Sequence, residues 1–84
     1  MKISVQSAAR CRHPVIVETL EASSRYPYKY VGVDKLNPIS LTFEVETVEE
    51  ERIVIMATEK ELKTVLGRGV QFRVVPFGKV VYYR

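Results

Sequence analysis

Hydrophobic and polar residues alternate in several short segments of the chain, which is the pattern of half-buried β-strands. The clearest segment is residues 39–47, ISLTFEVET, and residues 2–6, KISVQ, alternate in the same way. The apolar positions of the first segment, which would share one face of a sheet, are Ile39, Leu41, Phe43 and Val45. Residues 52–57, RIVIMA, are apolar on both faces, so we expect a more central strand that pairs with residues 39–47 as an antiparallel hairpin.

A helix is predicted over residues 58–67, TEKELKTVLG, by signals at both of its ends. Thr58 and Glu61 have the spacing of a capping box, in which each side chain accepts a hydrogen bond from the other residue's backbone N–H. The apolar residues at i, i+3 and i+4 share one helix face: Leu62, Val65 and Leu66. Gly67 can adopt the left-handed conformation that commonly ends a helix.

Residues 14–24 have two interpretations. Pro14 suits a first helical turn, and Ile16 and Leu20 are spaced four residues apart, which favours an amphipathic helix. The β-branched run VIV in the same stretch favours a strand instead. We prefer the helix, because the chain then has the order strand, helix, hairpin, helix, strand, with residues 25–38 as a loop or short edge strand.

The carboxyl-terminal residues, 70–84, predict a second hairpin. Pro76 presets the backbone for a turn, and Gly78 tolerates the positive φ that follows it. The strand residues that would point inward are Val70, Phe72 and Val74. Together the elements predict a single α+β domain over residues 1–84, with a small, mainly antiparallel sheet and one or two helices on one face.

With its C-terminal hairpin, the predicted order of elements resembles the βαββαβ order of ferredoxin-like domains. Such domains include RNA binders, metal carriers, regulatory domains and enzymes, so the resemblance implies no function. The aromatic RNP motifs of RNA-recognition domains are absent, since VQFRVVPF lacks their glycine–phenylalanine pattern.

The composition is that of an ordinary globular domain, 46% hydrophobic and 27% charged. No apolar run approaches the roughly 20 residues of a membrane-spanning helix, and the first residues lack the apolar core of a signal peptide. We therefore expect a cytoplasmic protein without a membrane partner. Scarce glutamine and asparagine beside abundant valine and glutamate are typical of thermophile proteins.

The net charge of +3 hides a separation of charges along the chain. Residues 1–35 carry six basic and three acidic side chains, whereas residues 36–67 carry three basic and seven acidic ones. The last segment has no acid and contains Arg68, Arg73, Lys79 and Arg84. This distribution predicts a protein with a basic face and an acidic edge.

Few residues suggest catalysis, so we expect a non-enzymatic protein without a cofactor. Cys11 and His13 are the only cysteine and histidine, and a structural zinc site needs four ligands, so we predict no metal site within one chain. Phosphate-loop and dinucleotide-binding glycine motifs are absent, and GRG at residues 67–69 is better explained as a helix end and a turn. A nucleophilic Cys11 paired with His13 is the alternative, since residues two apart on a strand share a face.

All five tyrosines lie in two segments that also carry positive charge. The first segment, RYPYKY, contains Arg25, Tyr26, Tyr28, Lys29 and Tyr30. Tyrosine rings stack on unpaired bases, worth about 1–3 kcal/mol per base, while basic side chains hold the phosphates. The same pattern also fits rings that pack at the rim of the core, or rings that lie in a protein interface.

The second segment is a predicted terminal strand that ends in Val81, Tyr82, Tyr83 and Arg84. A strand of this kind can add to the edge of another sheet, so we predict an interface here. The partner would be a second copy of the chain, giving a homodimer, or another protein of a larger assembly.

The leading hypothesis is a small module that binds RNA or single-stranded DNA. In this hypothesis the three tyrosines of RYPYKY stack on bases, and the phosphate contacts come from Arg25, Lys29, Arg68, Arg73 and Lys79. The competing hypothesis is a structural or interaction subunit that binds no nucleic acid.

Overall fold

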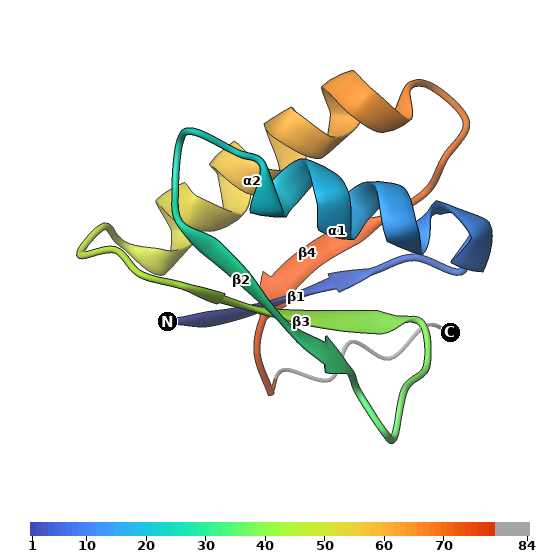
Figure 1. Ribbon diagram of the computed structural model, residues 1–84, viewed down its shortest axis with the longest axis horizontal. Helices are drawn as coiled ribbons and strands as arrows, with labels where there is room; N and C mark the ends of the chain where they lie inside the picture. Colours follow the sequence, from blue (N-terminus) through green and yellow to red (C-terminus); the bar gives the residue numbers. More distant parts are fainter. Residues whose placement is uncertain (79–84) are drawn as a thin grey trace.

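A computed structural model describes residues 1–78, which form a four-stranded sheet with two α-helices on one face (Figure 1). The elements are β1 (Lys2–Gln6), a 3-10 turn (Arg10–Arg12), α1 (His13–Glu21), β2 (Tyr28–Val33), β3 (Ser40–Val45), α2 (Glu51–Leu66) and β4 (Arg73–Pro76). The strands lie in the order β2-β3-β1-β4, and each neighbouring pair is antiparallel. The predicted α+β class is confirmed.

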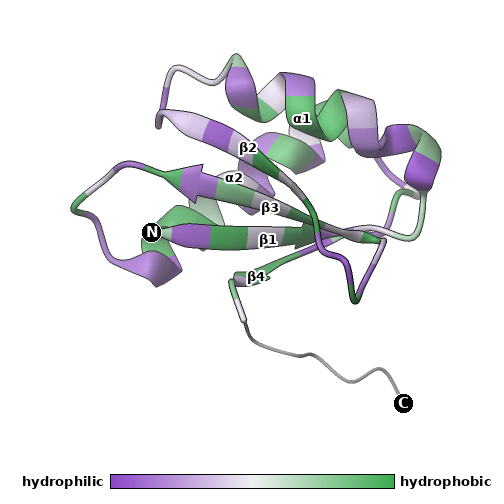
Figure 2. Ribbon diagram, turned by 60° about the horizontal axis from the view of Figure 1, so that its bottom comes forward, coloured by the Kyte–Doolittle hydropathy of each residue, from purple (hydrophilic) through white to green (hydrophobic). Residues whose placement is uncertain are grey.

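The core lies between the sheet and the two helices. Figure 2 shows hydrophobic and hydrophilic positions alternating along β1 and β3, so that one side of each strand faces the helices. The fully buried side chains of the sheet include Ile3, Val5, Leu41, Phe43 and Val45. Those of the helices include Ile16, Leu20, Val54 and Leu62. The inward face predicted for residues 41–45 is therefore confirmed.

The helix preferred for residues 14–24 is confirmed as α1, which begins one residue earlier and ends at Glu21. Pro14 lies in its first turn, where its missing N–H costs no hydrogen bond. Of the two interpretations of residues 25–38, the edge strand is confirmed. This strand, β2, pairs with β3 on one side and has a bulge between Tyr30 and Gly32.

The strand predicted over residues 52–57 is wrong, because these residues form the first half of α2. Glu50 is the N-cap residue. The negative carboxylate of Glu51 lies in the first turn, where it interacts favourably with the positive end of the helix dipole. Val54 is fully buried while Met56 is exposed, as expected for residues on opposite sides of a helix. The hairpin predicted for residues 39–57 is therefore replaced by pairing of β3 with β1 and β2.

The predicted capping box is also wrong, since Thr58 lies in the middle of α2. Its hydroxyl donates to the Val54 carbonyl at 2.7 Å, one turn earlier. The Glu61 carboxylate accepts a hydrogen bond from Ser23 at 2.9 Å, which joins α2 to the end of α1. The predicted helix end is confirmed at Gly67, whose φ is 73° and whose N–H donates to the Lys63 carbonyl.

The first half of the predicted C-terminal hairpin is β4, which pairs with β1. Val74 points into the core as predicted, and Val70 and Phe72 are partly buried against it. Gly78 has the expected positive φ of 84°. The second half of the hairpin lies outside the described residues.

Candidate functional site

The tyrosines of β2 and the residues before it lie on the face of the sheet that the helices cover. Tyr26 and Tyr28 are buried, and Tyr30 is partly buried against the core. The rings of Tyr26 and Tyr28 meet edge to face with centroids 6.0 Å apart, and the ring of Tyr30 lies 5.3 Å from that of Phe43. The stacking role stays a prediction, and the burial of Tyr26 and Tyr28 counts against these two rings as its carriers.

The hydroxyl groups of the two buried tyrosines both have partners. Thr58 uses its proton for the Val54 carbonyl, so the Tyr28 hydroxyl donates to the Thr58 oxygen at 2.6 Å. Tyr26 donates a short hydrogen bond to the Glu49 carboxylate. This bond raises the pKa of Tyr26, and burial raises the pKa of Tyr28. Both phenols therefore stay protonated. Their hydrogen bonds join β2 and the residues before it to Thr58 of α2 and to Glu49 just before α2.

The predicted phosphate-binding cations fall at opposite edges of the sheet. The Arg25 guanidinium lies 5.8 Å from the centre of the Tyr26 ring, and Lys29 is on the outer face of β2 opposite Glu44. Arg68 and Arg73 lie at the other edge, around β4. The structure therefore brings Arg68 and Arg73 together and leaves Arg25 and Lys29 apart from them.

The remaining predicted site residues lie outside the described residues. They are Lys79, predicted to bind phosphate, and the interface residues Val81, Tyr82, Tyr83 and Arg84.

A cavity of about 920 Å³, here called the basic cavity, lies between the end of β1, the last turn of α2 and the loop before β4. Its cationic side chains are Lys63, Arg68 and Arg73, and none of the described residues that line it is acidic. Its apolar wall includes Ile39, Val70 and Phe72. The positive charges and the aromatic ring together suit an anionic ligand that has a flat apolar part.

Gln6 forms part of the wall of the basic cavity. Only 7% of the residue is exposed to solvent, and its Oε1 atom has no hydrogen-bond partner in the described structure. A buried amide oxygen without a partner costs about 1–3 kcal/mol, so such a group usually meets water or a ligand. In the sheet Gln6 is paired with Arg73, which places the amide beside a cation of the cavity.

The loop between α2 and β4 shapes the rest of the basic cavity. Gly67 and Gly69 both have positive φ, which lets the chain turn sharply after α2. The buried Ser7 hydroxyl donates to the Gln71 carbonyl at 3.1 Å and fixes the loop to the end of β1. The carbonyl end of α2 faces this region and disfavours anions, but three cations outweigh its partial negative charge of roughly half a unit.

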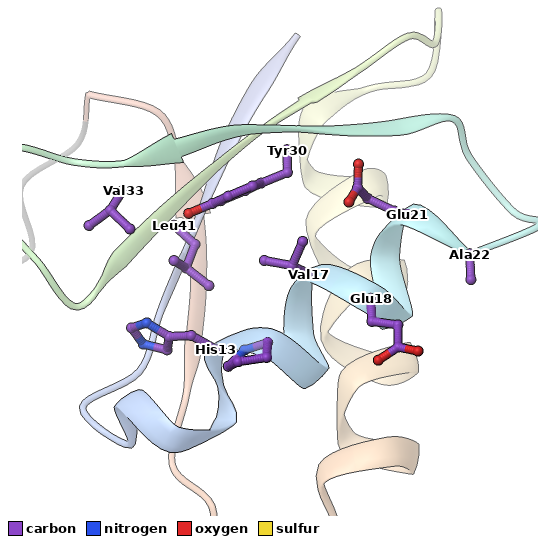
Figure 3. A pocket seen from close by; sticks show the side chains of 9 residues that line it. His13, Val17, Glu18, Glu21, Ala22, Tyr30, Val33 and Leu41 are labelled. Atoms are coloured by element: carbon purple, nitrogen blue, oxygen red, sulfur yellow. The ribbon is translucent and has the colours of Figure 1, made fainter.

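A second cavity of about 700 Å³ lies between α1 and the sheet and is here called the α1–β2 groove (Figure 3). Its lining from α1 includes Val17, Glu18 and Glu21, and its lining from the sheet is Tyr30, Val33 and Leu41. No sequence signal pointed to it, because its residues come from three elements whose pairing is set by the fold.

Cys11 and His13 do not form a paired catalytic site of the predicted kind, because they lie in a 3-10 turn and at the start of α1 rather than on a strand. The His13 Nε2 atom is 2.8 Å from the Ser7 carbonyl, to which it donates. Cys11 is exposed. Among residues 1–78, no three histidine, cysteine, aspartate or glutamate side chains are grouped so that they could hold a metal ion.

Comparisons with protein-family models, with curated proteins and with solved structures find no match to this chain. In the part of the chain that the structure describes, neither helix has the length and apolar character needed to cross a membrane. Function is therefore inferred from the two cavities and the residues around them.

Proposed function

We propose that the protein is a small non-enzymatic binding module for RNA or single-stranded DNA, and that the basic cavity holds the nucleic-acid backbone. The observation that carries the proposal is the grouping of Lys63, Arg68 and Arg73 around one cavity whose described lining contains no acidic residue. Basic side chains that bind phosphates release condensed counterions, which drives association at low salt.

The apolar wall of the basic cavity supports a single strand over a duplex. Phe72 is partly buried and lines the cavity beside Val70, so an unstacked base has an aromatic surface to contact. The amide of Gln6 lies in the same wall and can bond the polar edge of a base or a sugar hydroxyl. A paired base would hide these edges within the duplex.

This proposal moves the predicted binding surface from the tyrosines to the cavity between the end of β1, the last turn of α2 and the loop before β4. Arg68 and Arg73 keep the role expected from the sequence, whereas Lys63 enters from α2. Tyr30 is the tyrosine of RYPYKY that lines a cavity, but that cavity is the α1–β2 groove, which shares no lining residue with the basic cavity.

The test is fluorescence anisotropy of labelled single-stranded RNA, single-stranded DNA and duplex DNA, titrated at several salt concentrations. The Lys63→Gln, Arg68→Gln double variant should weaken binding and lower the slope of log affinity against log salt by about one for each phosphate contact removed. A Phe72→Leu variant should weaken single-strand binding at high salt, where the electrostatic part is small.

The matched control is the Arg25→Gln, Lys29→Gln double variant, which removes the same charge at the other edge of the sheet. It should bind nearly as the original protein does. Equal losses in the two double variants would show that net charge alone drives association. Absence of binding at about 20 mM salt, where nonspecific association is strong, would overturn the proposal.

A further inference from the structure

One edge of the four-stranded sheet is formed by β2. β2 pairs with β3 on one side only, so half of its backbone N–H and C=O groups point away from the sheet. Val31 and Val33 of this strand are about half exposed, with 52% and 47% of their surface open to solvent. Among residues 1–78 no other strand covers this edge.

The α1–β2 groove runs beside this edge. Figure 3 shows α1 on one side and β2 on the other, with Tyr30, Val17 and Leu41 pointing into the space between them. An extended chain that paired with β2 would place every second side chain on the helix-facing side, about 6.6–7 Å apart, and so into this groove. Edge strand and groove are thus arranged for strand addition of a peptide, in which main-chain bonds add to side-chain contacts.

The charges at the groove decide the kind of peptide. Glu18 and Glu21 are exposed on α1, and neither forms an ion pair with any described residue. No lysine or arginine is among the described residues that line the groove. Val17, Val33 and Leu41 supply the apolar surface. A segment with apolar and basic side chains on one face complements both features.

The bulge in β2 and the charge of Lys29 make pairing between two copies of this strand unfavourable. A bulge twists an edge away from flat pairing, and a lysine on an edge strand disfavours pairing with another copy of the same edge. A short peptide avoids both costs because it contacts one copy and follows the twist of the strand.

We propose that the α1–β2 groove binds an extended segment of a protein partner, which adds to β2 and places a lysine or arginine between apolar side chains beside Glu18 and Glu21. This role is distinct from nucleic-acid binding, since the groove and the basic cavity share no lining residue.

The experiment is an NMR titration of the 15N-labelled protein with the capped peptide Thr-Val-Thr-Lys-Thr-Val-Thr, in which two valines and the lysine share one face. Shifts are expected for amides of β2 and α1, and the exposed β2 amides should exchange more slowly with solvent. The same peptide with glutamate in place of lysine should bind at least tenfold more weakly.

The Glu18→Gln, Glu21→Gln double variant should weaken binding of the lysine peptide about tenfold. The control Glu44→Gln, Glu46→Gln removes two exposed carboxylates that do not line the groove and should bind as the original protein does. The Lys63→Gln, Arg68→Gln variant should also bind the peptide normally, which separates this site from the basic cavity.

Three results would overturn the proposal. The first is the absence of β2 shifts at millimolar peptide. The second is equal binding of the lysine and glutamate peptides. The third is that hexylammonium reproduces the α1 shifts while the peptide leaves the β2 amides unprotected, which would make the groove a small-molecule site.

Discussion

The hydroxyl oxygens of Tyr28 and Thr58 lie 2.6 Å apart inside the core and join the edge strand β2 to the middle of α2. Thr58 is fully buried and Tyr28 is 7% exposed, so water does not replace this bond when it is lost. The pair explains why a tyrosine and a threonine occupy positions where the core is otherwise apolar. Each satisfies the polar group of the other.

Tyr28→Phe should lower the free energy of unfolding by about 1 kcal/mol, because it removes one buried hydrogen bond and little volume. The matched control is Tyr30→Phe, whose hydroxyl makes no hydrogen bond to the described residues. It should leave stability within about 0.5 kcal/mol. Urea denaturation of the three proteins measures both, and equal stability of the two variants would show that the Tyr28–Thr58 bond contributes nothing.

Val54→Ala and Met56→Ala should differ sharply in stability. Val54 is fully buried, so its loss should cost about 2 kcal/mol from two buried methyl groups and the cavity they leave. Met56 is 66% exposed and should cost less than about 0.5 kcal/mol. In a strand these two residues would share a face and respond alike, so similar losses in urea denaturation would contradict the helical assignment of residues 51–57.

Gly67→Ala should lower the free energy of unfolding by about 1–3 kcal/mol. Gly67 has φ 73° and ψ −171°, a conformation that residues with a Cβ atom rarely adopt. No atom lies within 4 Å of a Cβ added there, so the loss comes from the backbone and not from a clash. Gly67→Asn should be no milder, since asparagine tolerates the left-handed helical region but not this ψ.

Thermal or urea denaturation measures the cost at residue 67, and Arg68→Ala is its control for a change in the same loop. Arg68 has an ordinary negative φ, so this control should stay within about 0.5 kcal/mol of the original protein. A Gly67→Ala variant as stable as the control would mean that the loop relaxes to another conformation.

Stability should fall as the pH rises above about 10, the ordinary pKa of tyrosine. The pKa of Tyr26 is raised by its bond to Glu49, and that of Tyr28 by burial, so both phenols hold their protons more tightly in the folded protein. Their contribution is complete below the pKa of the unfolded chain and is lost as the pH rises through the higher folded values.

Urea denaturation at pH 8 to 11 follows this loss. The Tyr26→Phe, Tyr28→Phe double variant should be less stable at pH 8 but should lose less stability between pH 9 and 11. Parallel curves for the two proteins would assign the alkaline loss to lysines or to the remaining tyrosines.

Much of the fold could be predicted where hydrophobic periodicity was unambiguous. Residues 41–45 alternate strictly, and β3 has the predicted inward face. Residues 52–57 are apolar at nearly every position, so their sequence fits a strand and a helix equally well. The helical period is hidden because Ile53 and Met56 are apolar yet exposed, at 40% and 66%. Sequence cannot tell which of several apolar residues the tertiary fold will bury.

The basic cavity could be predicted only in part. The acid-free segment that contains Arg68 and Arg73 showed where positive charge gathers along the chain. Lys63 joins them through the turn after α2, and Gln6 joins them through the pairing of β1 with β4, in which it lies opposite Arg73 from the far end of the chain. The role of the tyrosines could not be decided from the sequence, because aromatic residues with nearby charges suit a core rim as well as a base-stacking surface.

The position of β1 in the sheet has a consequence for folding during synthesis. β1 is the first strand of the described residues along the chain, and it lies between β3 and β4. Its pairing with β4 requires residues 73–76, so one edge of β1 stays open until nearly all of the described chain has left the ribosome. Non-local pairing of this kind slows folding, and an open edge on a partly made chain can pair with another such chain. Ribosomes that translate this message one after another would therefore hold neighbouring nascent chains with the same unpaired strand exposed.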